Sequence, residues 1–397
     1  MIVALLFVAM VLNYFDRQMI AVLKPTLAAD LSWNEGDYAN IITAFQAAYA
    51  ASYLLLGRFV DRFGAKAGFA VAFAVWSVAQ IAHGFVRSPI GFVAARVLLG
   101  MGEGGAYPAG LTAVAQWFPK SERAFATGVV NAGVNIGAIV TPIVVPFLVL
   151  RFGWRSAFVI TGIVGTIWLV GWVLAFPVPR DNGTRTNPDS LPGVAWSRVF
   201  RRKETWAYAI AKFLIDPIWW MFLFWLPDFF AKRYGLDLRS FGPPLVFIYI
   251  LSDLGNLSGG WLSSHLIKRG VQVGVARKVT MLICVFLAVP VAFAMYAHSM
   301  WLAACLIGLA AAAHQAFSVN LFTFPSDVFP PSAAGSVIGF GGMAGAIGGM
   351  AIAQFTGWIL SSFGTYTPMF AMACSAYLLA LLAIHLLSPS FREVELI

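Results

Sequence analysis

Apolar residues fill the chain in long runs that short polar segments interrupt. An α-helix needs about 20 such residues to cross ~30 Å of hydrocarbon. Twelve runs of suitable length can be delimited, at 1–28, 38–60, 66–86, 89–117, 122–148, 154–176, 205–231, 241–266, 276–297, 300–324, 333–361 and 366–388. The pattern predicts an all-α integral membrane protein with twelve spanning helices.

The twelve predicted spans form two sets of six. A long polar segment, 177–204, separates the sixth span from the seventh and contains six basic residues. We therefore expect an N-terminal six-helix bundle at 1–176, a cytoplasmic linker at 177–204 and a C-terminal six-helix bundle at 205–397. Two halves of this kind are typical of transporters built from repeats.

Composition agrees with a membrane protein. Hydrophobic residues make up 60% of the chain and charged residues 11%, whereas a soluble domain is about half apolar and a quarter charged. Soluble enzymes, disordered proteins and nucleic-acid-binding proteins are thereby excluded. The net charge of +9 needs no acidic partner, because loops on the inner face of a membrane are enriched in Lys and Arg.

The same bias predicts the orientation. With the N-terminus inside, the predicted inner loops hold 16 of the 26 Lys and Arg residues, and the outer loops hold 7, Lys24 among them. Both termini are therefore expected in the cytoplasm. The sequence contains no Walker loop, nucleophile elbow or metal-ligand cluster, so we expect no enzyme activity, cofactor or bound metal.

The turn after the second predicted span carries the most specific motif, G-x-x-x-D-R-x-G-x-K. Gly57 permits close helix approach, Gly64 permits a tight turn, and Asp61 and Arg62 can pair at a helix end. The alternative is a loop whose basic residues only set topology. The motif resembles the signature of the major facilitator superfamily, and with the two sets of six spans the resemblance covers essentially the whole chain. It implies that superfamily's twelve-helix fold.

In the first half of the chain, ionisable residues at membrane depth include Asp16 and Arg17 in the first span and Arg96 and Glu103 in the fourth. A charge there costs at least ~2.5–3.5 kcal/mol, so each is a functional candidate. An arginine can bind a carboxylate anion with two hydrogen bonds, and burial favours the protonated form of a carboxyl. Arg17 is thus expected to bind an anion while Asp16 and Glu103 take protons. The alternative is a salt-bridge cluster that only fixes helix packing, Arg96 in particular.

The segments 13–17, 96–104 and 116–123 resemble the anion:cation symporter family, which includes bacterial sugar-acid transporters and the vertebrate organic-anion transporters related to sialin. The resemblance implies that Asp16 and Glu103 are the proton sites. It also implies that Arg17 and Tyr49 line the anion site.

The second half resembles the hexuronate transporters of that family, in segments 212–227, 252–260, 313–316 and 326–329. These proteins move glucuronate and galacturonate with protons, so we expect a protein of the bacterial inner membrane. We also expect it to be a monomer. The eleventh span departs from other sugar-acid relatives, because Gly341, Gly342, Ala344 and Gly345 occupy positions where some of them place a polar contact.

Further polar and aromatic residues within spans are candidates for substrate contact. Hydroxyl-rich substrates need neutral donors and acceptors, which favours Asn131, Asn135 and Gln315; the alternative is hydrogen bonding between helices. His314 fits either role. One of the tryptophans near Trp220 is a candidate for stacking on a sugar, although packing is the commoner role of such rings.

Two acidic residues of the second half have structural interpretations. Lys212 and Asp216 are four residues apart and can pair on one helix face. Asp253 is interpreted as structural rather than as a proton site. Lys212, Asp216 and Asp253 remain supporting candidates, as does Arg96.

The resulting hypothesis is proton-coupled symport of a hexuronate by alternating access. Within the same class, an aldonate, aldarate, tartrate or phthalate-like acid is the alternative substrate, and sodium coupling stays open. From a different class, a transporter-like sensor of sugar acids is the alternative. Such a sensor would be expected to carry a sizeable cytoplasmic domain. The longest cytoplasmic segments expected in this sequence are the linker and a short C-terminal segment.

Overall fold

The computed structural model describes residues 1–118, 120–175, 196–392 and 394, so most of the predicted linker lies outside the described residues. Within them every regular element is a helix. In chain order these are α1 (Ile2–Leu31), α2 (Glu35–His83), α3 (Pro89–Glu103), α4 (Ala106–Trp117), α5 (Lys120–Ala175), α6 (Trp196–Phe200), α7 (Lys203–Tyr234), α8 (Gly242–Lys268), α9 (Val273–Ala288), the 3₁₀ helix η2 (Val289–Tyr296), α10 (Met300–Val328), α11 (Pro331–Phe363) and α12 (Thr367–Leu387). The all-α membrane class is confirmed.

Two helices each cover a pair of predicted spans. Helix α2 turns at Gly64, where φ is 82°, and α5 turns at Gly153, where φ is 79°. L side chains rarely adopt such a φ, so glycine is required at both turns. The expected tight turn at Gly64 is therefore present, although the hydrogen-bond pattern runs through it.

The span predicted at 89–117 is helical but divided. The segment forms α3 and α4, with a break at Gly104 and Gly105. A Cβ atom on Gly104 would lie 2.7 Å from the carbonyl oxygen of Tyr49, so the break brings this backbone against α2. Two adjacent glycines also have low helix propensity, which was the sequence signal for the break.

Nine helices in the described part of the chain are long and apolar enough to cross a membrane. The difference from twelve has a simple origin. The two predicted spans of α5 count as one segment, and α3 and α4, with 15 and 12 residues, are each too short. In α2 only the part from Arg62 to His83 is counted.

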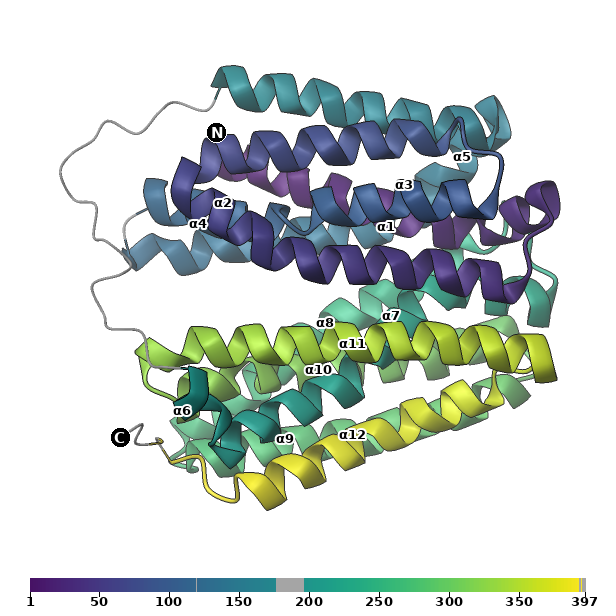
Figure 1. Ribbon diagram of the computed structural model, residues 1–397. Helices are drawn as coiled ribbons and strands as arrows, with labels where there is room; N and C mark the ends of the chain where they lie inside the picture. Colours follow the sequence, from purple (N-terminus) through teal and green to yellow (C-terminus); the bar gives the residue numbers. More distant parts are fainter. Residues whose placement is uncertain (119, 176–195, 393, 395–397) are drawn as a thin grey trace. The chain divides into compact units, whose positions relative to one another are not determined.

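Close contacts divide the chain into two units. Unit 1 comprises Met1–Asp181 and Leu223–Val246, and unit 2 comprises Asn182–Phe222 and Phe247–Ile397. Helix α7, which Figure 1 labels, therefore contributes its first part to unit 2 and its second part to unit 1. The boundaries of the predicted halves remain a prediction.

In unit 1, α3 packs on α2 and α1 packs on α5. Glycines make both contacts close. A Cβ atom on Gly100 of α3 would lie 2.5 Å from the carbonyl oxygen of Phe45, and one on Gly133 of α5 would lie 2.4 Å from that of Phe7. Small residues of this kind let membrane helices approach backbone to backbone, and the polar residues of α1 are thereby enclosed.

In unit 2, the glycines of α11 receive side chains from the first part of α7. A Cβ atom on Gly341 would lie 2.1 Å from Cε1 of Tyr208, and one on Gly345 would lie 2.1 Å from Oδ2 of Asp216. Packing against α7 therefore explains two of the small residues that set the eleventh span apart, Gly341 and Gly345. Gly342, in contrast, has no atom within 4 Å of an added Cβ.

We predict that Gly341→Ala destabilises the protein and that Gly342→Ala does not. The first change drives a methyl group into the Tyr208 ring, and overpacking of this kind costs about 1–3 kcal/mol. The second is tolerated because its position is open, and alanine favours the helix. Thermal unfolding of the purified protein in detergent would show a Tm lower by several degrees for Gly341→Ala alone. Equal Tm values for the two variants would contradict the packing argument.

Candidate functional site

A buried ion pair joins α1 to α3 in unit 1. Arg17 Nε donates to Glu103 Oε2 at 2.9 Å, and Arg17 Nη2 donates to Asn13 Oδ1 at 3.0 Å. The Arg17 and Glu103 side chains are 4% and 0% exposed. The structure thus brings together the arginine predicted to bind an anion and the glutamate predicted to bind a proton.

Aromatic rings enclose the Arg17 guanidinium. Its Cζ atom lies 4.7 Å from the ring centroids of Tyr14 and Tyr49 and 5.5 Å from that of Phe45. Cation–π contacts of this length stabilise a desolvated cation. Tyr49 was predicted to line this site. Tyr14 and Phe45 were missed, although Tyr14 precedes Arg17 by three residues and Phe45 precedes Tyr49 by four, both of which are same-face helical spacings.

Asp16 makes a separate set of contacts. Trp76 Nε1 donates to Asp16 Oδ2 at 2.7 Å, and Gln80 Nε2 donates to Asp16 Oδ1 at 2.9 Å and to Thr161 Oγ1 at 2.9 Å. Asp16 is thus held by α2 and by a residue that also contacts α5. Trp76 and Gln80 were missed; a glutamine inside an apolar run, one helical turn from a tryptophan, was the available signal.

Arg96 lies between these two sets of contacts. It is 0% exposed, and its Nη1 donates to the carbonyl oxygen of Arg17 at 3.4 Å. Within the described residues, Arg96 Nε and Nη2 and Glu103 Oε1 have no hydrogen-bond partner. Buried polar atoms are normally satisfied by protein or by water, so this cluster has spare capacity for water or for a polar ligand.

Charge balance fixes what the cluster can do. Asp16, Arg17, Arg96 and Glu103 sum to zero when both acids are ionised. If a carboxylate ligand replaced Glu103 on Arg17, the replaced glutamate would have to be neutralised, since an unpaired buried charge is costly.

The other candidates of unit 1 are scattered. Asn131 of α5 is exposed and shares a side-chain hydrogen bond with Tyr107, and Asn135 is half-buried. In the motif after the second predicted span, Arg62 is exposed, and its guanidinium lies 5.4 Å from the centroid of the Phe63 ring. The surroundings of Gly57 and of the Asp61 side chain lie outside what the structure describes.

In unit 2, Lys212 and Asp216 form the expected pair, with Nζ and Oδ2 2.7 Å apart. His314 is buried, and both ring nitrogens are engaged, Nδ1 with the Tyr377 hydroxyl at 3.1 Å and Nε2 with the Ser318 hydroxyl at 3.2 Å. These contacts favour a packing role for His314. The ring stacked on it, at 5.5 Å, belongs to Trp219.

The remaining candidates of unit 2 are half-buried: Trp220 on α7, Asp253 on α8 and Gln315 on α10. Unit 2 also contains a charged network that the sequence did not predict. Arg277 at the start of α9 pairs with Asp327 at 3.3 Å and donates to Ser263 at 2.9 Å. It ties α9 to α10 and α8, and it stands at the helix ends rather than among the mid-span candidates.

A family model described as Major Facilitator Superfamily matches residues 6–353. This chain belongs to the major facilitator superfamily. It is therefore a membrane transporter rather than an enzyme. The helices that the structure describes are consistent with the twelve spans that the sequence pattern predicted.

Known proteins resemble the chain over nearly its full length. It is 30% identical to the hexuronate transporter of Escherichia coli K12, over 99% of this chain and 94% of that protein. It is 25% identical to the D-galactonate transporter of a second E. coli strain, over 98% and 95%. Among solved structures, a bacterial homologue of the human lysosomal transporter Spinster, in an inward-facing and unoccupied conformation, matches with a TM-score of 0.77 and 18% identity, over 98% and 95% of the two chains.

We predict that Trp76→Phe destabilises the protein through Asp16. The phenyl ring keeps the contact with Phe73, whose centroid is 4.0 Å away, but Asp16 loses one of its donors. A buried acceptor left without its partner costs about 1–3 kcal/mol. Trp206→Phe is the matched control, because its indole is exposed and donates only to a backbone carbonyl.

Thermal unfolding should give a lower Tm for Trp76→Phe than for Trp206→Phe. The loss should shrink when Trp76→Phe is made in an Asp16→Ala background, since no acceptor is then left to lose its donor. A loss of the same size in both backgrounds would show that Trp76 acts by packing alone.

Proposed function

We propose that the protein is a proton-coupled symporter that moves a hexuronate, such as glucuronate or galacturonate, into a bacterial cell by alternating access. The hexuronate transporter of E. coli K12 supports the substrate class, at 30% identity over nearly the whole chain. The observation that carries the coupling is the buried Arg17–Glu103 pair. We place the protein in the inner membrane as a monomer with both termini in the cytoplasm.

Coupling follows from competition at one guanidinium. The substrate carboxylate and the Glu103 carboxylate are the same chemical group, and both are bound best by Arg17. A proton on Glu103 weakens the internal pair and leaves Arg17 to the substrate. Binding of the anion and binding of the proton therefore promote each other, as linkage requires. Tyr49, whose ring faces the same guanidinium, forms a wall of the anion site.

Asp16 supplies a second protonation site in this proposal. It sits on Trp76 and Gln80 rather than on Arg17, so it acts on the anion site through charge. Arg96, fully buried next to the Arg17 backbone, balances whichever of the two acids is ionised. The Asp61–Arg62 turn would then open and close with the cycle.

Sugar hydroxyls require further partners. We assign them to Asn131, Asn135, Gln315 and Trp220, which are exposed or half-buried side chains on α5, α10 and α7. An aldonate is the second candidate substrate, supported by the D-galactonate transporter at 25% identity. Aldonates and hexuronates share one carboxylate and several hydroxyls, so the same residues would serve both.

The deciding experiment is uptake of labelled glucuronate into proteoliposomes under an imposed inward pH gradient, with sodium varied. Accumulation that needs the gradient and not sodium supports the proposal. Accumulation only of galactonate, tartrate, an aldarate or phthalate would replace the hexuronate. Dependence on sodium would replace the proton, and binding without flux would indicate a sensor.

We predict that Glu103→Gln abolishes uphill accumulation and retains exchange of substrate across the membrane. Glutamine cannot release a proton, so Arg17 stays available to the anion but no gradient is used. Counterflow with substrate on both sides measures the exchange. Glu122→Gln is the matched control, because Glu122 is exposed in the first turn of α5. Full gradient-driven uptake by Glu103→Gln would remove Glu103 from the proton site.

We also predict that uptake is electrogenic. Two protons with one monoanion carry one positive charge inward, which is worth ~2.3 kcal/mol per 100 mV, or about fifty-fold accumulation. An inside-negative potential imposed with valinomycin should drive uptake by the unaltered protein. Asp16→Asn should lose this dependence while still responding to the pH gradient. Potential-driven uptake by both proteins would exclude Asp16 as the second site.

A further inference from the structure

Helix α8 packs against α10 in unit 2 through small residues. A Cβ atom on Gly255 would lie 2.1 Å from the carbonyl oxygen of Ala312, and one on Gly259 would lie 2.5 Å from the Cα atom of Ala316. Asn320 Nδ2 also donates to the carbonyl oxygen of Gly259, at 3.2 Å. Because the contact residues ascend together along the chain, the two helices run parallel, with Gly255 level with Ala312.

Outside this contact, α8 carries an apolar stripe and two polar side chains. Leu254, Leu257 and Trp261 are 55%, 72% and 65% exposed, as expected of side chains that meet lipid. Asp253 and Asn256 are three residues apart and are therefore neighbours on the helix surface. Both are half-buried, and neither has a hydrogen-bond or ion-pair partner among the residues that the structure describes.

Gln315 of α10 lies on the same side of this helix pair. It directly precedes Ala316, whereas Asn256 directly follows Gly255, and in parallel helices these opposite offsets place both side chains on one side of the contact. The register separates them by two residues, or about 3 Å along the helix axes. Gln315 is half-buried, and within the described part of the chain it too has no partner. We call Asp253, Asn256 and Gln315 the polar face of unit 2.

The polar face lies at membrane depth and needs polar partners. Its three residues are near the middle of two helices that are long and apolar enough to span a membrane, Gly242–Lys268 and Met300–Val328. An ionisable residue at this depth faces the interior of a helix bundle or a water-filled cavity rather than lipid. Since no described side chain pairs with Asp253, water or a ligand has to satisfy its carboxylate.

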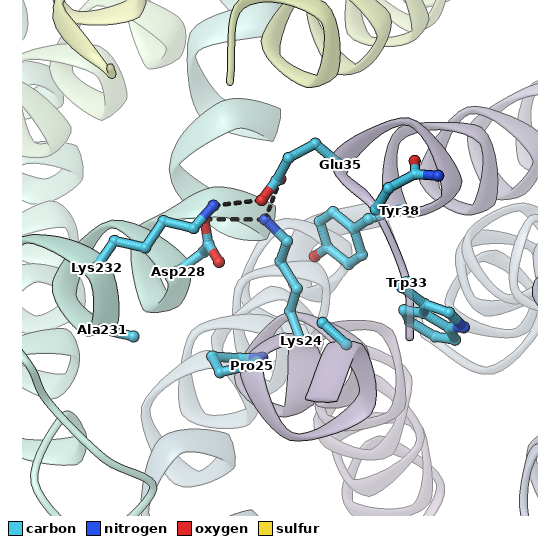
Figure 2. Close-up of a pocket in the computed structure, with 10 residues that line it drawn as sticks. Lys24, Pro25, Trp33, Glu35, Tyr38, Asp228, Ala231 and Lys232 are labelled. Atoms are coloured by element: carbon cyan, nitrogen blue, oxygen red, sulfur yellow. Dashed lines mark hydrogen bonds and ion pairs between the residues drawn. The ribbon is translucent and has the colours of Figure 1, made fainter. Parts of the chain in front are cut away.

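The cavity of about 290 Å³ beside Lys24 in unit 1 has no such unmet demand (Figure 2). Lys24 pairs with Glu35 at 2.6 Å and with Asp228 at 2.9 Å, and Lys232 pairs with the same two carboxylates. These two cations and two anions satisfy one another, so no ligand is needed to balance them. The polar face differs, because its carboxylate and its two amides have nothing to bind among the described residues.

The donors and acceptors of the polar face match hydroxyl groups. An ionised carboxylate only accepts hydrogen bonds, whereas the amides of Asn256 and Gln315 both donate and accept, as a hydroxyl does. Two adjacent hydroxyls can donate to the two oxygens of one carboxylate through short, charge-assisted hydrogen bonds. A carboxylate group of a ligand, in contrast, would be repelled by Asp253. The face therefore suits the hydroxyl-bearing part of a sugar acid rather than its acid group.

We propose that the polar face recognises the hydroxyl groups of the transported acid, and that Asp253 accepts hydrogen bonds from two adjacent hydroxyls. The proposal rests on the transport function proposed above, and it adds Asp253 and Asn256 to Gln315 as residues that determine specificity. It defines the substrate class as acids with neighbouring hydroxyls. A site built to bind a hydroxyl strongly rejects an analogue that lacks it, so phthalate-like acids are excluded.

The test compares the binding of glucuronate with that of its deoxy analogues, each of which lacks one hydroxyl. Titration calorimetry on the full-length protein in detergent, at one fixed pH, gives the Kd values. We expect two analogues, lacking neighbouring hydroxyls, to bind the unaltered protein about tenfold more weakly than glucuronate. In Asp253→Ala the loss of either hydroxyl should change Kd by less than about twofold, because the acceptor is gone. Equal losses in both proteins would overturn the proposal.

Ser258→Ala is the matched control. Ser258 lies on the same helix, is exposed, and donates to the backbone carbonyl of Gly255. This variant should keep the Kd of glucuronate and the losses seen with the analogues; if it abolishes those losses as Asp253→Ala does, the proposal is rejected. Asn256→Ala covers the case in which Asp253→Ala fails to fold. It should weaken glucuronate binding about threefold, and an unchanged Kd would also reject the polar face.

Two further outcomes separate this proposal from its alternatives. With saturating glucuronate, Asp253→Asn in proteoliposomes should still accumulate substrate under a pH gradient; loss of that dependence with an unchanged Kd would make Asp253 a proton site and overturn the proposal. If glucuronate does not bind the unaltered protein, the hexuronate function fails, and the same comparison with galactonate and its deoxy analogues decides hydroxyl recognition. Binding of phthalate alone would reject both.

Discussion

The buried guanidinium of Arg17 is the constraint around which unit 1 is arranged. A lone charge in hydrocarbon is strongly unfavourable, and this one is met by Glu103, by Asn13 and by aromatic faces. Such enclosure needs helices that approach closely, which the glycines of α3 and α5 permit. The close packing of α1 and the burial of Arg17 are thus one requirement, since looser helices would admit water to the Arg17–Glu103 pair.

Neutral groups of charges recur at the other buried ionic sites that the structure describes. Lys212 and Asp216 cancel on α7, and Lys24 and Lys232 cancel with Glu35 and Asp228. The two groups differ in geometry. The first pair lies within one helix, whereas the other four side chains join α1, α2 and α7.

Residues that are costly to bury could be predicted from the sequence, and residues that only serve them could not. Arg17 and Glu103 stand out in apolar runs, and the structure places them in contact. Trp76 and Phe45 are ordinary members of such runs, because hydrophobicity alone does not say which face of a helix meets a charge. Lys24 was counted as a basic residue of an outer loop, which is the role that a lysine at a span end usually has, so its partner on α7 was missed.

The length of the apolar runs predicted the helices, while the breaks needed three-dimensional contacts.

Charge balance at the Arg17–Glu103 pair explains why partly loaded states are disfavoured. With Glu103 ionised on Arg17 this pair is neutral, and in the proposed cycle a proton on Glu103 and an anion on Arg17 keep it neutral, while the second proton, on Asp16, carries the net charge. At the pair, a proton without the anion, or the anion without a proton, leaves one uncompensated charge away from water, which is costly. In the proposed cycle the pair is therefore compensated when it is empty or fully loaded, and this restriction, rather than tight binding of either ligand, would tie the two fluxes together.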